Sequence, residues 1–314
     1  MRNLHRHSIM KPGRVLHCAE SRDSLPRVSS IQISKLILKL IPVKGPYSLS
    51  LDWTNWKFSD TNINILTLGI NHDGMAFPVV FKMMDKIGNS STEDCKDLIT
   101  KFLGIACDGS IAHLMAYREF VGSDRLAFLN SMGIHYHIGI RENFHVIRHG
   151  SESKAHCLFA DLVLGECKHL SGIYYVNGQP CYLSASKIKD KDGSRSFRSL
   201  FLIATQRNHL RCTSRDDRLR RCAKGSRAVA STLKPFTSES KNGMANLLAI
   251  IMLAYVWCYL VDIYIHENIK KIKVLHHGRR AKSLFKYGLE YISQCLLSHT
   301  NRYYIDIFKF LSYT

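Results

Sequence analysis

Residues 46 to 81 contain three apolar runs, each with the length and composition of a β-strand. The runs cover residues 47–51, 62–70 and 75–81. Their Leu, Ile, Val, Phe and Tyr side chains suit the pleated, half-buried surface of a sheet. The segment NHDG at 71–74 lies between the second and third runs, and an Asp-Gly pair is typical of a tight hairpin turn. We therefore predict three consecutive antiparallel strands, around which the rest of the chain must fold.

One acidic residue, Asp52, follows the first apolar run directly. We predict that it lies at the C-terminal end of the first strand, at the edge of the sheet. A carboxylate in that place is suited to hold a divalent metal ion, because such ions prefer hard oxygen ligands. The function of the chain therefore depends on whether other segments bring partners to Asp52.

The chain up to residue 143 predicts further helices and strands in alternation. A short amphipathic helix, stopped by a proline, precedes the three strands, and a capped helix, a strand, a glycine-closed helix and a last strand follow them. These elements are expected at 33–41, from Ser91 or Thr92 onward, at 111–116, at 123–133 and at 134–143. The order βββαβαβ over residues 45–143 predicts a mixed α/β domain.

The second half of the chain predicts three segments of different character. Residues 144–205 read as a β-rich insert packed beside the first domain, with strands at 155–165, 172–186 and 197–205 joined by turn sequences. Residues 206–243 have no periodicity, and they hold ten Lys and Arg against three acids. Residues 244–314 predict C-terminal helices that complete the core.

The apolar stretch at 244–261 is long enough to cross a membrane. Asn246 lies within it, and no second span is present, so we expect a buried core helix and no membrane contact. A membrane protein is the alternative, and it would partition into detergent through this stretch.

The charge balance is strongly basic. The chain has 44 Lys and Arg against 25 Asp and Glu, a net charge of +19, and such a field attracts polyanions, of which nucleic acid is the usual one. The ten Cys contain no CxxC pair, which indicates neither a zinc finger nor a disulfide framework and fits reduced thiols in a cytoplasm. The first 35 residues are polar and basic, without the apolar core of a signal peptide.

Several segments, taken in order, resemble the insertion-sequence type 4 transposases of the DDE superfamily. The resemblance covers about residues 35–205 and 244 to the end, and the segments that carry it are SLDWTNWKFSDTNINILTLGINHDGMAFPVVFKMMDKIGNSSTE, AYREFVG, GIHYHIGIRENF, GQPCYLSASKIK, NLLAIIMLAYVWCYLVD and HENIKKIKVLHHGRRAKSLFKYGLEYI. It implies a ribonuclease-H-like fold with a β-rich insert before the last catalytic helix. It also implies cleavage and transfer of DNA strands by two Mg²⁺ or Mn²⁺ ions held between three carboxylates.

The resemblance transfers unevenly to single residues. Asp52 matches the first catalytic aspartate and metal ligand of the family, although Trp53 replaces the arginine that follows it there. Tyr117 occupies the place of the second aspartate in YREF, and a phenol is a poor ligand for Mg²⁺. Glu119, two residues further on, is the candidate substitute, because it points to the same face if the strand continues.

Basic residues near these motifs are candidates for contacts with DNA phosphates. They are Arg118, Arg141 and, in the segment HHGRRAK, Arg279, Arg280 and Lys282. A solvated basic surface is the alternative interpretation. The nearby residues His135, His137, His145 and His149 are read as incidental residues of a surface strand rather than a zinc site.

The third carboxylate of the family, within a Tyr-Arg-Glu-Lys signature, has no counterpart in residues 206–243. Codons such as TCA AGA GCA GTG GCT TCA ACC TTG encode Ser226–Leu233, and a shifted frame of the same bases reads Lys-Ser-Ser-Gly-Phe-Asn-Leu, close to the family's sequence after its catalytic glutamate. Our hypothesis is that 206–243 is translated out of frame. Residues 1–44 read as a basic N-terminal remnant and a short helix, and residues 1–34 do not resemble the helical DNA-binding region of the family.

The sequence therefore predicts a degenerate DNA transposase of the bacterial cytoplasm, associated with the nucleoid. Its expected partners are the double-stranded DNA ends of its element and a second copy of itself in a homodimer. Its cleavage activity is expected to be lost with its carboxylates. Two alternatives remain open, a catalytically dead DNA-binding regulator of a sibling element and a non-functional pseudogene product.

Overall fold

The computed structural model describes the chain in ten stretches. These are residues 29–58, 61–73, 75–84, 91–106, 111–189, 197–205, 241–276, 281, 284–298 and 305–312. Most of the basic N-terminal segment and nearly all of the irregular segment 206–243 lie outside the described residues, so the structure does not address the frameshift hypothesis. The described part is a mixed α/β fold built on one mixed sheet, which confirms the predicted fold class.

The three predicted strands form a meander. β1 (Tyr47–Phe58) pairs antiparallel with β2 (Thr61–His72), and β2 pairs antiparallel with β3 (Met75–Met84). His72 lies opposite Met75, and Asp73 has a positive φ of 46°. The backbone therefore turns within the two residues between β2 and β3, as the Asp-Gly pair predicted.

The sheet continues with two strands that run parallel to β1. β4 (Ile111–Ala116) pairs parallel with β1, and β5 (Tyr136–Ile140) pairs parallel with β4, so that these five strands follow the order β3-β2-β1-β4-β5. The helices α2 (Thr92–Ala106) and α3 (Ser123–Ser131) connect β3 to β4 and β4 to β5. Gly133 follows α3 with a φ of 64°, as expected of a glycine that closes a helix.

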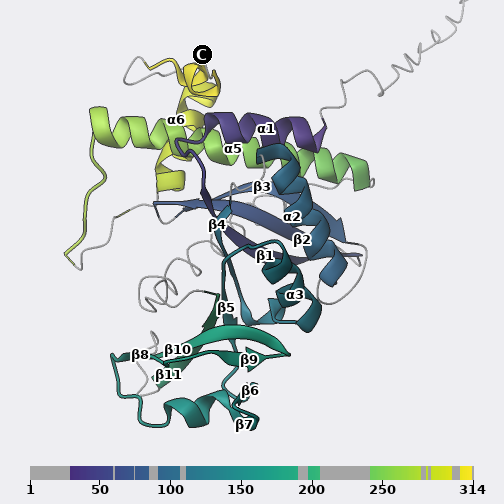
Figure 1. Cartoon of the computed structure of the whole chain (residues 1–314). Coiled ribbons are helices and arrows are strands. Elements are labelled where there is room, and N and C mark those ends of the chain that lie inside the picture. The colour runs from purple at the N-terminus through teal and green to yellow at the C-terminus, as the bar shows by residue number, and fades with distance from the viewer. Residues whose placement is uncertain are drawn as a thin grey trace, which may run out of the picture.

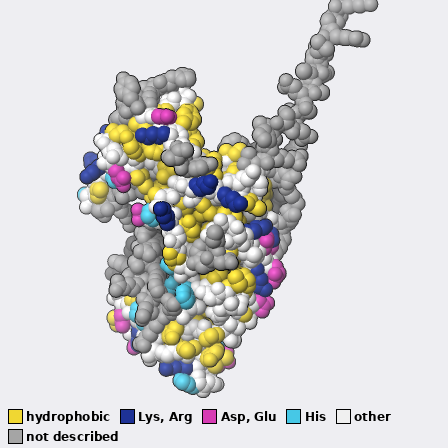
Figure 2. All heavy atoms as spheres, turned by 45° about the horizontal axis from the view of Figure 1, so that its top comes forward, with side chains coloured by type: hydrophobic (Ala, Val, Ile, Leu, Met, Phe, Trp, Pro, Cys, Tyr) yellow, Lys and Arg dark blue, Asp and Glu magenta, His cyan; other side chains and the backbone are white. Residues whose placement is uncertain are grey.

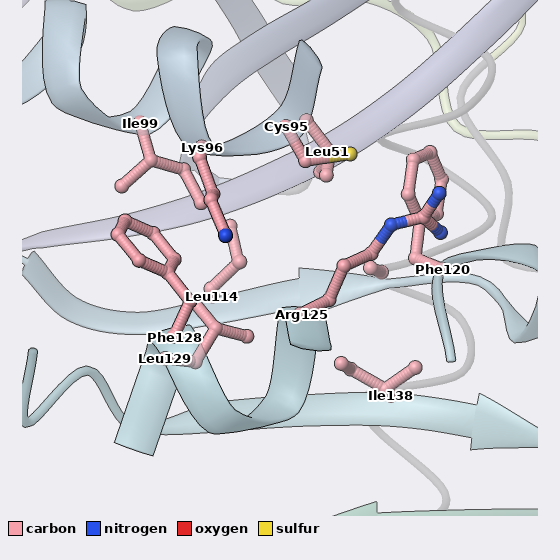
Figure 3. A pocket seen from close by; sticks show the side chains of 11 residues that line it. Leu51, Cys95, Lys96, Ile99, Leu114, Phe120, Arg125, Phe128, Leu129 and Ile138 are labelled. Atoms are coloured by element: carbon pink, nitrogen blue, oxygen red, sulfur yellow. The ribbon is translucent and has the colours of Figure 1, made fainter. Parts of the chain in front are cut away.

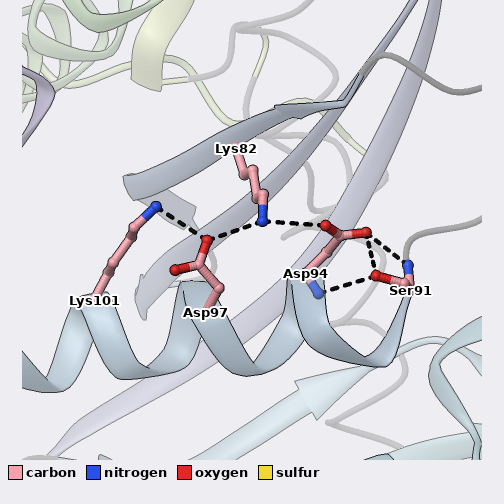
Figure 4. A network of polar contacts seen from close by, with 5 residues as sticks. All are labelled: Lys82, Ser91, Asp94, Asp97 and Lys101. Atoms are coloured by element: carbon pink, nitrogen blue, oxygen red, sulfur yellow. Dashed lines mark hydrogen bonds and ion pairs between the residues drawn. The ribbon is translucent and has the colours of Figure 1, made fainter.

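Ion pairs attach α2 to the edge strand β3 (Figure 4). The Lys82 ammonium of β3 lies 3.0 Å from the Asp97 carboxylate and 3.1 Å from that of Asp94, both on α2. Lys101, one turn after Asp97, also lies 3.0 Å from the Asp97 carboxylate. Ser91 caps the helix, because its hydroxyl accepts a hydrogen bond from the Asp94 backbone N–H at 3.1 Å.

The helices α1 (Ser30–Leu40), α5 (Lys241–Asn268) and α6 (Leu284–Ser298) gather at the β3 end of the sheet, at the top of Figure 1. Ser29 and Gln32 form a capping box at the start of α1. The Ser34 hydroxyl of α1 donates to the carbonyl of Val79, which lies at a bulge of β3. Phe77 of β3 packs edge-on against Tyr259 of α5, with ring centroids 4.6 Å apart.

The apolar helix α5 is a core helix in its packing. It is the one helix among the described residues that is long and apolar enough to cross a membrane, over Ala245–Asn268. Its side chains contact α1, β3, α6 and the short helix η4 (Ile307–Leu311), and Trp257 donates its indole N–H to the Ile307 carbonyl at 2.7 Å. Asp262 is fully buried in it. These contacts are those of the buried core helix that the sequence predicted.

The β-rich segment is part of the same sheet rather than a layer beside it. Its two longest strands are β10 (Gln179–Lys189) and β11 (Phe197–Ala204), and β11 pairs antiparallel with β5. The remaining elements are β6 (His145–Arg148), β7 (Ser151–Lys154), η2 (Ala155–Phe159), β8 (Cys167–His169) and β9 (Tyr174–Val176). These elements lie at the bottom of Figure 1, opposite the helices at the β3 end.

One predicted strand of this segment is wrong. Residues 155–165 form the 3₁₀ helix η2 followed by turns, because Phe159 and Leu162 point into the core at a three-residue spacing while the residues between them are exposed. The Asn177-Gly178 turn between β9 and β10 has positive φ at both residues, as predicted for a tight hairpin.

Candidate functional site

Asp52 lies in the middle of β1 rather than at its C-terminal end. The strand runs on to Phe58, because residues 53–58 continue the antiparallel ladder with β2. The pairing with β4, in contrast, ends at Leu51 and Ala116. Asp52 is therefore the first β1 residue beyond the parallel part of the sheet, which corrects the sequence prediction but keeps the carboxylate beside the end of a neighbouring strand.

The carboxylate of Asp52 is buried. The residue is 5% exposed, and its Oδ1 accepts a hydrogen bond from the backbone N–H of Trp53 at 3.0 Å. Thr67 of β2, which is also buried, lies opposite it in the ladder. A carboxylate in such a place costs stability unless its surroundings compensate for the lost water.

Tyr117 lies beside Asp52. Because Leu51 pairs with Ala116 in parallel register, the next residues on the two strands, Asp52 and Tyr117, are neighbours at the point where β1 and β4 separate. Tyr117 is half-buried against the hydrophobic core and directly precedes the 3₁₀ helix η1 (Arg118–Phe120). Positions 52 and 117 thus directly follow a pair of residues on two neighbouring strands.

Glu119 does not take the place expected of a substitute ligand. Strand β4 ends at Ala116, and Glu119 lies in η1, so the alternation that was to bring it to the face of Asp52 does not apply. Arg125 of α3 holds η1 in this position: its guanidinium donates to the Glu119 carbonyl at 3.0 Å and lies over the Phe120 ring.

A row of polar side chains runs along the face of Asp52, and sequence reasoning missed it. Alternation along β1 puts Ser48 and Ser50 on this face, with His113 of β4 and His137 of β5 beside them. The Ser48 hydroxyl and His113 Nε2 are 2.9 Å apart, and the His113 and His137 rings pack edge to face with centroids 5.3 Å apart.

The earlier assignment of His137 to a surface strand is wrong. β5 lies between β4 and β11, and His137 is 2% exposed. The signal in the sequence was the alternation of histidine with apolar residues in HYHI, which fits a strand with one polar and one apolar face as well as it fits an edge strand.

Two of the five basic residues predicted to contact DNA reach the same edge of the sheet as Asp52. Arg118 follows β4 and Arg141 follows β5, and both are exposed. Since β1, β4 and β5 are parallel, their carboxyl ends meet at one edge. Arg279, Arg280 and Lys282 lie outside the described residues.

The residues at this edge do not fit a two-metal centre. The family's chemistry needs three carboxylates, whereas the residues that follow the Leu51–Ala116 pair on the two strands are one aspartate, Asp52, and one tyrosine, Tyr117. Within the described stretches, no three His, Cys, Asp or Glu side chains converge as metal ligands. Asp52 alone supplies a hard anionic oxygen, so no catalytic step through Mg²⁺ or Mn²⁺ can be built on the described residues.

Two cavities of the described part do not have Asp52 in their lining. An apolar one of about 20 Å³, lined by α2, α3 and the sheet face that holds Leu51 and Ile138, is walled by hydrocarbon and the stem of Arg125 (Figure 3). It is a packing void rather than a ligand site. An open groove of about 300 Å³ lies near His135 and Thr205, at the amino end of β5 and thus away from Asp52.

The basic charge of the chain is unevenly divided. The described residues hold 22 of the 44 Lys and Arg and 15 of the 25 Asp and Glu, an excess of seven out of the total of 19. On the face shown in Figure 2, Lys and Arg are dispersed in small groups among hydrophobic and uncharged surface. Most of the charge that predicts a polyanionic partner therefore belongs to residues outside the described part.

Comparison with protein-family models and with curated protein sequences found no match for this chain.

Proposed function

We propose that this protein is a degenerate transposase of the insertion-sequence type 4 group, which binds double-stranded DNA but does not cleave it. The proposal rests on the ordered motifs of the sequence and on the arrangement of the sheet. Its expected setting is the bacterial cytoplasm, with the ends of an insertion element and a second copy of the chain as partners.

The strand arrangement supports a ribonuclease-H-like fold. Three antiparallel strands in the order β3-β2-β1 are followed by β4 and β5, parallel to β1, with helical crossovers between them. The order βββαβαβ along the chain is the one that the sequence predicted. Fold alone does not specify activity, so the functional part of the proposal depends on positions 52 and 117.

The observation that carries the proposal is the parallel register of Leu51 with Ala116. Asp52 and Tyr117 directly follow this pair on neighbouring strands, and the resemblance assigns the family's first two metal-binding aspartates to these two positions. Two segments far apart in the sequence, which the motifs assign to one site, thus lie on neighbouring strands. The second position, however, holds a phenol, which removes one of the charges that clamp the metal ions.

A cleavage assay tests the loss of activity. Supercoiled plasmid and linear duplex DNA are incubated with the full chain and millimolar Mg²⁺ or Mn²⁺, beside the Asp52→Ala variant. We expect the two proteins to give equal, background nicking. Nicking by the unsubstituted protein that Asp52→Ala abolishes would overturn the proposal, because it would show a working site built on Asp52.

A gain-of-binding experiment tests the geometry independently of activity. Tyr117→Asp creates a pair of adjacent carboxylates, so we expect its affinity for Mn²⁺, measured by paramagnetic resonance, to rise about tenfold or more over the unsubstituted protein, the equivalent of about 1.4 kcal/mol. The double variant Asp52→Asn/Tyr117→Asp is the control and should lose this gain. Equal affinity in all three proteins would mean that positions 52 and 117 do not share a site.

A DNA-binding measurement separates the proposal from the alternatives. Nonspecific duplex binding that weakens steeply with salt is expected of a degenerate transposase, since phosphate contacts release counterions. Tight binding to one sequence without cleavage would favour the regulator of a sibling element. Affinity that does not change between low and moderate salt would contradict nucleic-acid binding of either kind.

A further inference from the structure

The segment that follows α5 carries three exposed lysines within four residues. Lys270, Lys271 and Lys273 flank Ile272, which is 7% exposed and packs into the hydrophobic core. The segment leaves the end of α5 at the left of Figure 1 and runs away from the helices. It therefore presents its charges on a projecting part of the molecule.

Two hydrogen bonds hold this segment in place. The Ile272 backbone N–H donates to His266 Nδ1 at 2.8 Å, and the Ala281 backbone N–H donates to the Lys273 carbonyl at 2.8 Å. The first bond anchors the centre of the lysine group to α5, and the second brings the chain back beside Lys273. Together with the buried Ile272 side chain, they make the lysine group a fixed surface feature, so little conformational entropy of the backbone is lost when it binds a ligand.

Some lysines of the described residues are held in ion pairs, whereas the three after α5 are not. Lys82, Lys96, Lys101 and Lys168 each lie within ion-pair distance of an Asp or Glu. Within the described part of the chain, none of the three after α5 forms such a pair. Their charges are thus available to an external anion.

The position of a helix end explains only one of these charges. The Lys270 backbone N–H, just after α5, donates to the Ile265 carbonyl of its last turn at 2.7 Å, and a cation beside the end of a helix is favoured by the helix dipole. Lys271 and Lys273 lie beyond that turn, and the dipole effect falls off within it. A stabilising role in the helix does not account for the group.

We propose that Lys270, Lys271 and Lys273 form a docking surface for the phosphate backbone of double-stranded DNA. Three exposed ammonium groups on an anchored, projecting segment contact successive phosphates without reading base edges, so the surface adds affinity and orientation but no sequence preference. The inference rests on the proposed DNA-binding function and extends it to residues for which neither the family motifs nor the predicted HHGRRAK patch gave a role.

The test compares two triple variants of the full chain that lose the same charge. One is Lys270→Gln/Lys271→Gln/Lys273→Gln, and the matched control removes three ion-paired lysines in Lys96→Gln/Lys101→Gln/Lys168→Gln. Equilibrium affinity for a random-sequence duplex is measured by fluorescence anisotropy over a range of salt concentrations, after circular dichroism shows that both variants are folded.

We expect the slope of log affinity against log salt to become shallower by about 2.7 in the first variant, at about 0.9 for each lost phosphate contact. Over a fourfold rise in salt, the unsubstituted protein then loses about 40-fold more affinity than this variant. The control keeps the slope of the unsubstituted protein. Equal slopes in the two variants would overturn the inference, because net charge rather than this surface would then set the affinity.

Two further outcomes are decisive. If the unsubstituted chain does not bind duplex DNA at all, the proposed function itself fails. If the first variant keeps its DNA affinity but loses binding to phosphatidylcholine vesicles that contain phosphatidylserine, the surface recognises an anionic membrane and the inference about DNA is wrong.

Discussion

The packing of α6 on α5 depends on the glycine at position 288. A Cβ atom added there would lie 1.9 Å from the Cys258 carbonyl oxygen and 2.8 Å from its carbon. Both atoms belong to the α5 backbone, so no side-chain rotation relieves the contact. Cβ atoms do not come closer than about 3.0 Å to other heavy atoms. The two helices must therefore move apart by about 1.1 Å, the difference between 3.0 Å and the 1.9 Å to the Cys258 oxygen.

We expect Gly288→Ala to destabilise the protein by about 2 kcal/mol or more. Overpacking of a close-packed site costs about 1–3 kcal/mol, and backbone-to-backbone contact belongs at the upper end of that range. Alanine recovers up to about 1 kcal/mol through its higher helix propensity. The net loss should lower the melting temperature by about 4 °C or more, measured by circular dichroism.

Gly104→Ala is the matched control. Gly104 lies in α2, is exposed, and has no atom within 4 Å of an added Cβ. The same substitution should therefore stabilise the protein by up to about 1 kcal/mol through propensity alone. If both variants raise the melting temperature, α5 and α6 are not packed backbone to backbone, and the assignment of α5 to the soluble core loses its main support.

Two further predictions concern pH and thiol chemistry. The hydrogen bond from Lys82 lowers the pKa of Asp97 below 3.8. The ion pair therefore stabilises the fold above pH 3.8, and this stabilisation disappears as the pH falls through the lowered pKa. Urea unfolding at successive pH values should show that Lys82→Met removes this acid-induced loss, which is about 1 kcal/mol or less for a partly exposed pair. Burial raises the pKa of the Cys181 thiol to about 12. After treatment of the native protein with an alkylating reagent, residue-resolved mass spectrometry should find Cys181 unmodified and the exposed Cys157 modified. Rapid alkylation of Cys181 would contradict its burial.

The alternation of apolar residues and the turn sequences were sufficient to predict most of the sheet. The Asp-Gly turn before Met75 and the Asn177-Gly178 turn need residues that accept positive φ, which is a local property and readable from sequence. The order of helices and strands through residue 143 followed in the same way, since each element has its own period and end signals.

Errors arose where tertiary contacts decided the outcome. The end of the apolar run at Leu51 was taken as the end of β1, but β2 supplies backbone hydrogen bonds as far as Phe58, so polar residues remain in the strand. Residues 155–165 are as apolar as a strand, yet their burial follows a three-residue spacing. In both cases the deciding partner is distant in sequence, and a propensity scale cannot include it.

The candidate site was predictable as a set of positions but not as a set of contacts. The motifs identified Asp52 and Tyr117, and the parallel register of β1 and β4 brings them together. The polar row of Ser48, His113 and His137 escaped notice because each strand looked apolar on its own. A row of this kind depends on the alignment of three strands, which single-strand patterns do not show.

The proposed function implies that Tyr117 stands in place of an aspartate, and this has a physical consequence beyond the loss of a metal ligand. Two carboxylates at adjacent strand ends repel each other unless a cation lies between them. Tyr117 removes that repulsion, and its ring adds apolar contacts with the core at a half-buried position. Without metal, the protein with Tyr117 is therefore expected to be more stable than an ancestral form with aspartate at both positions. Metal binding to the native state should offset the difference in the Tyr117→Asp variant, so that its melting temperature rises with Mn²⁺ concentration while that of the unsubstituted protein does not.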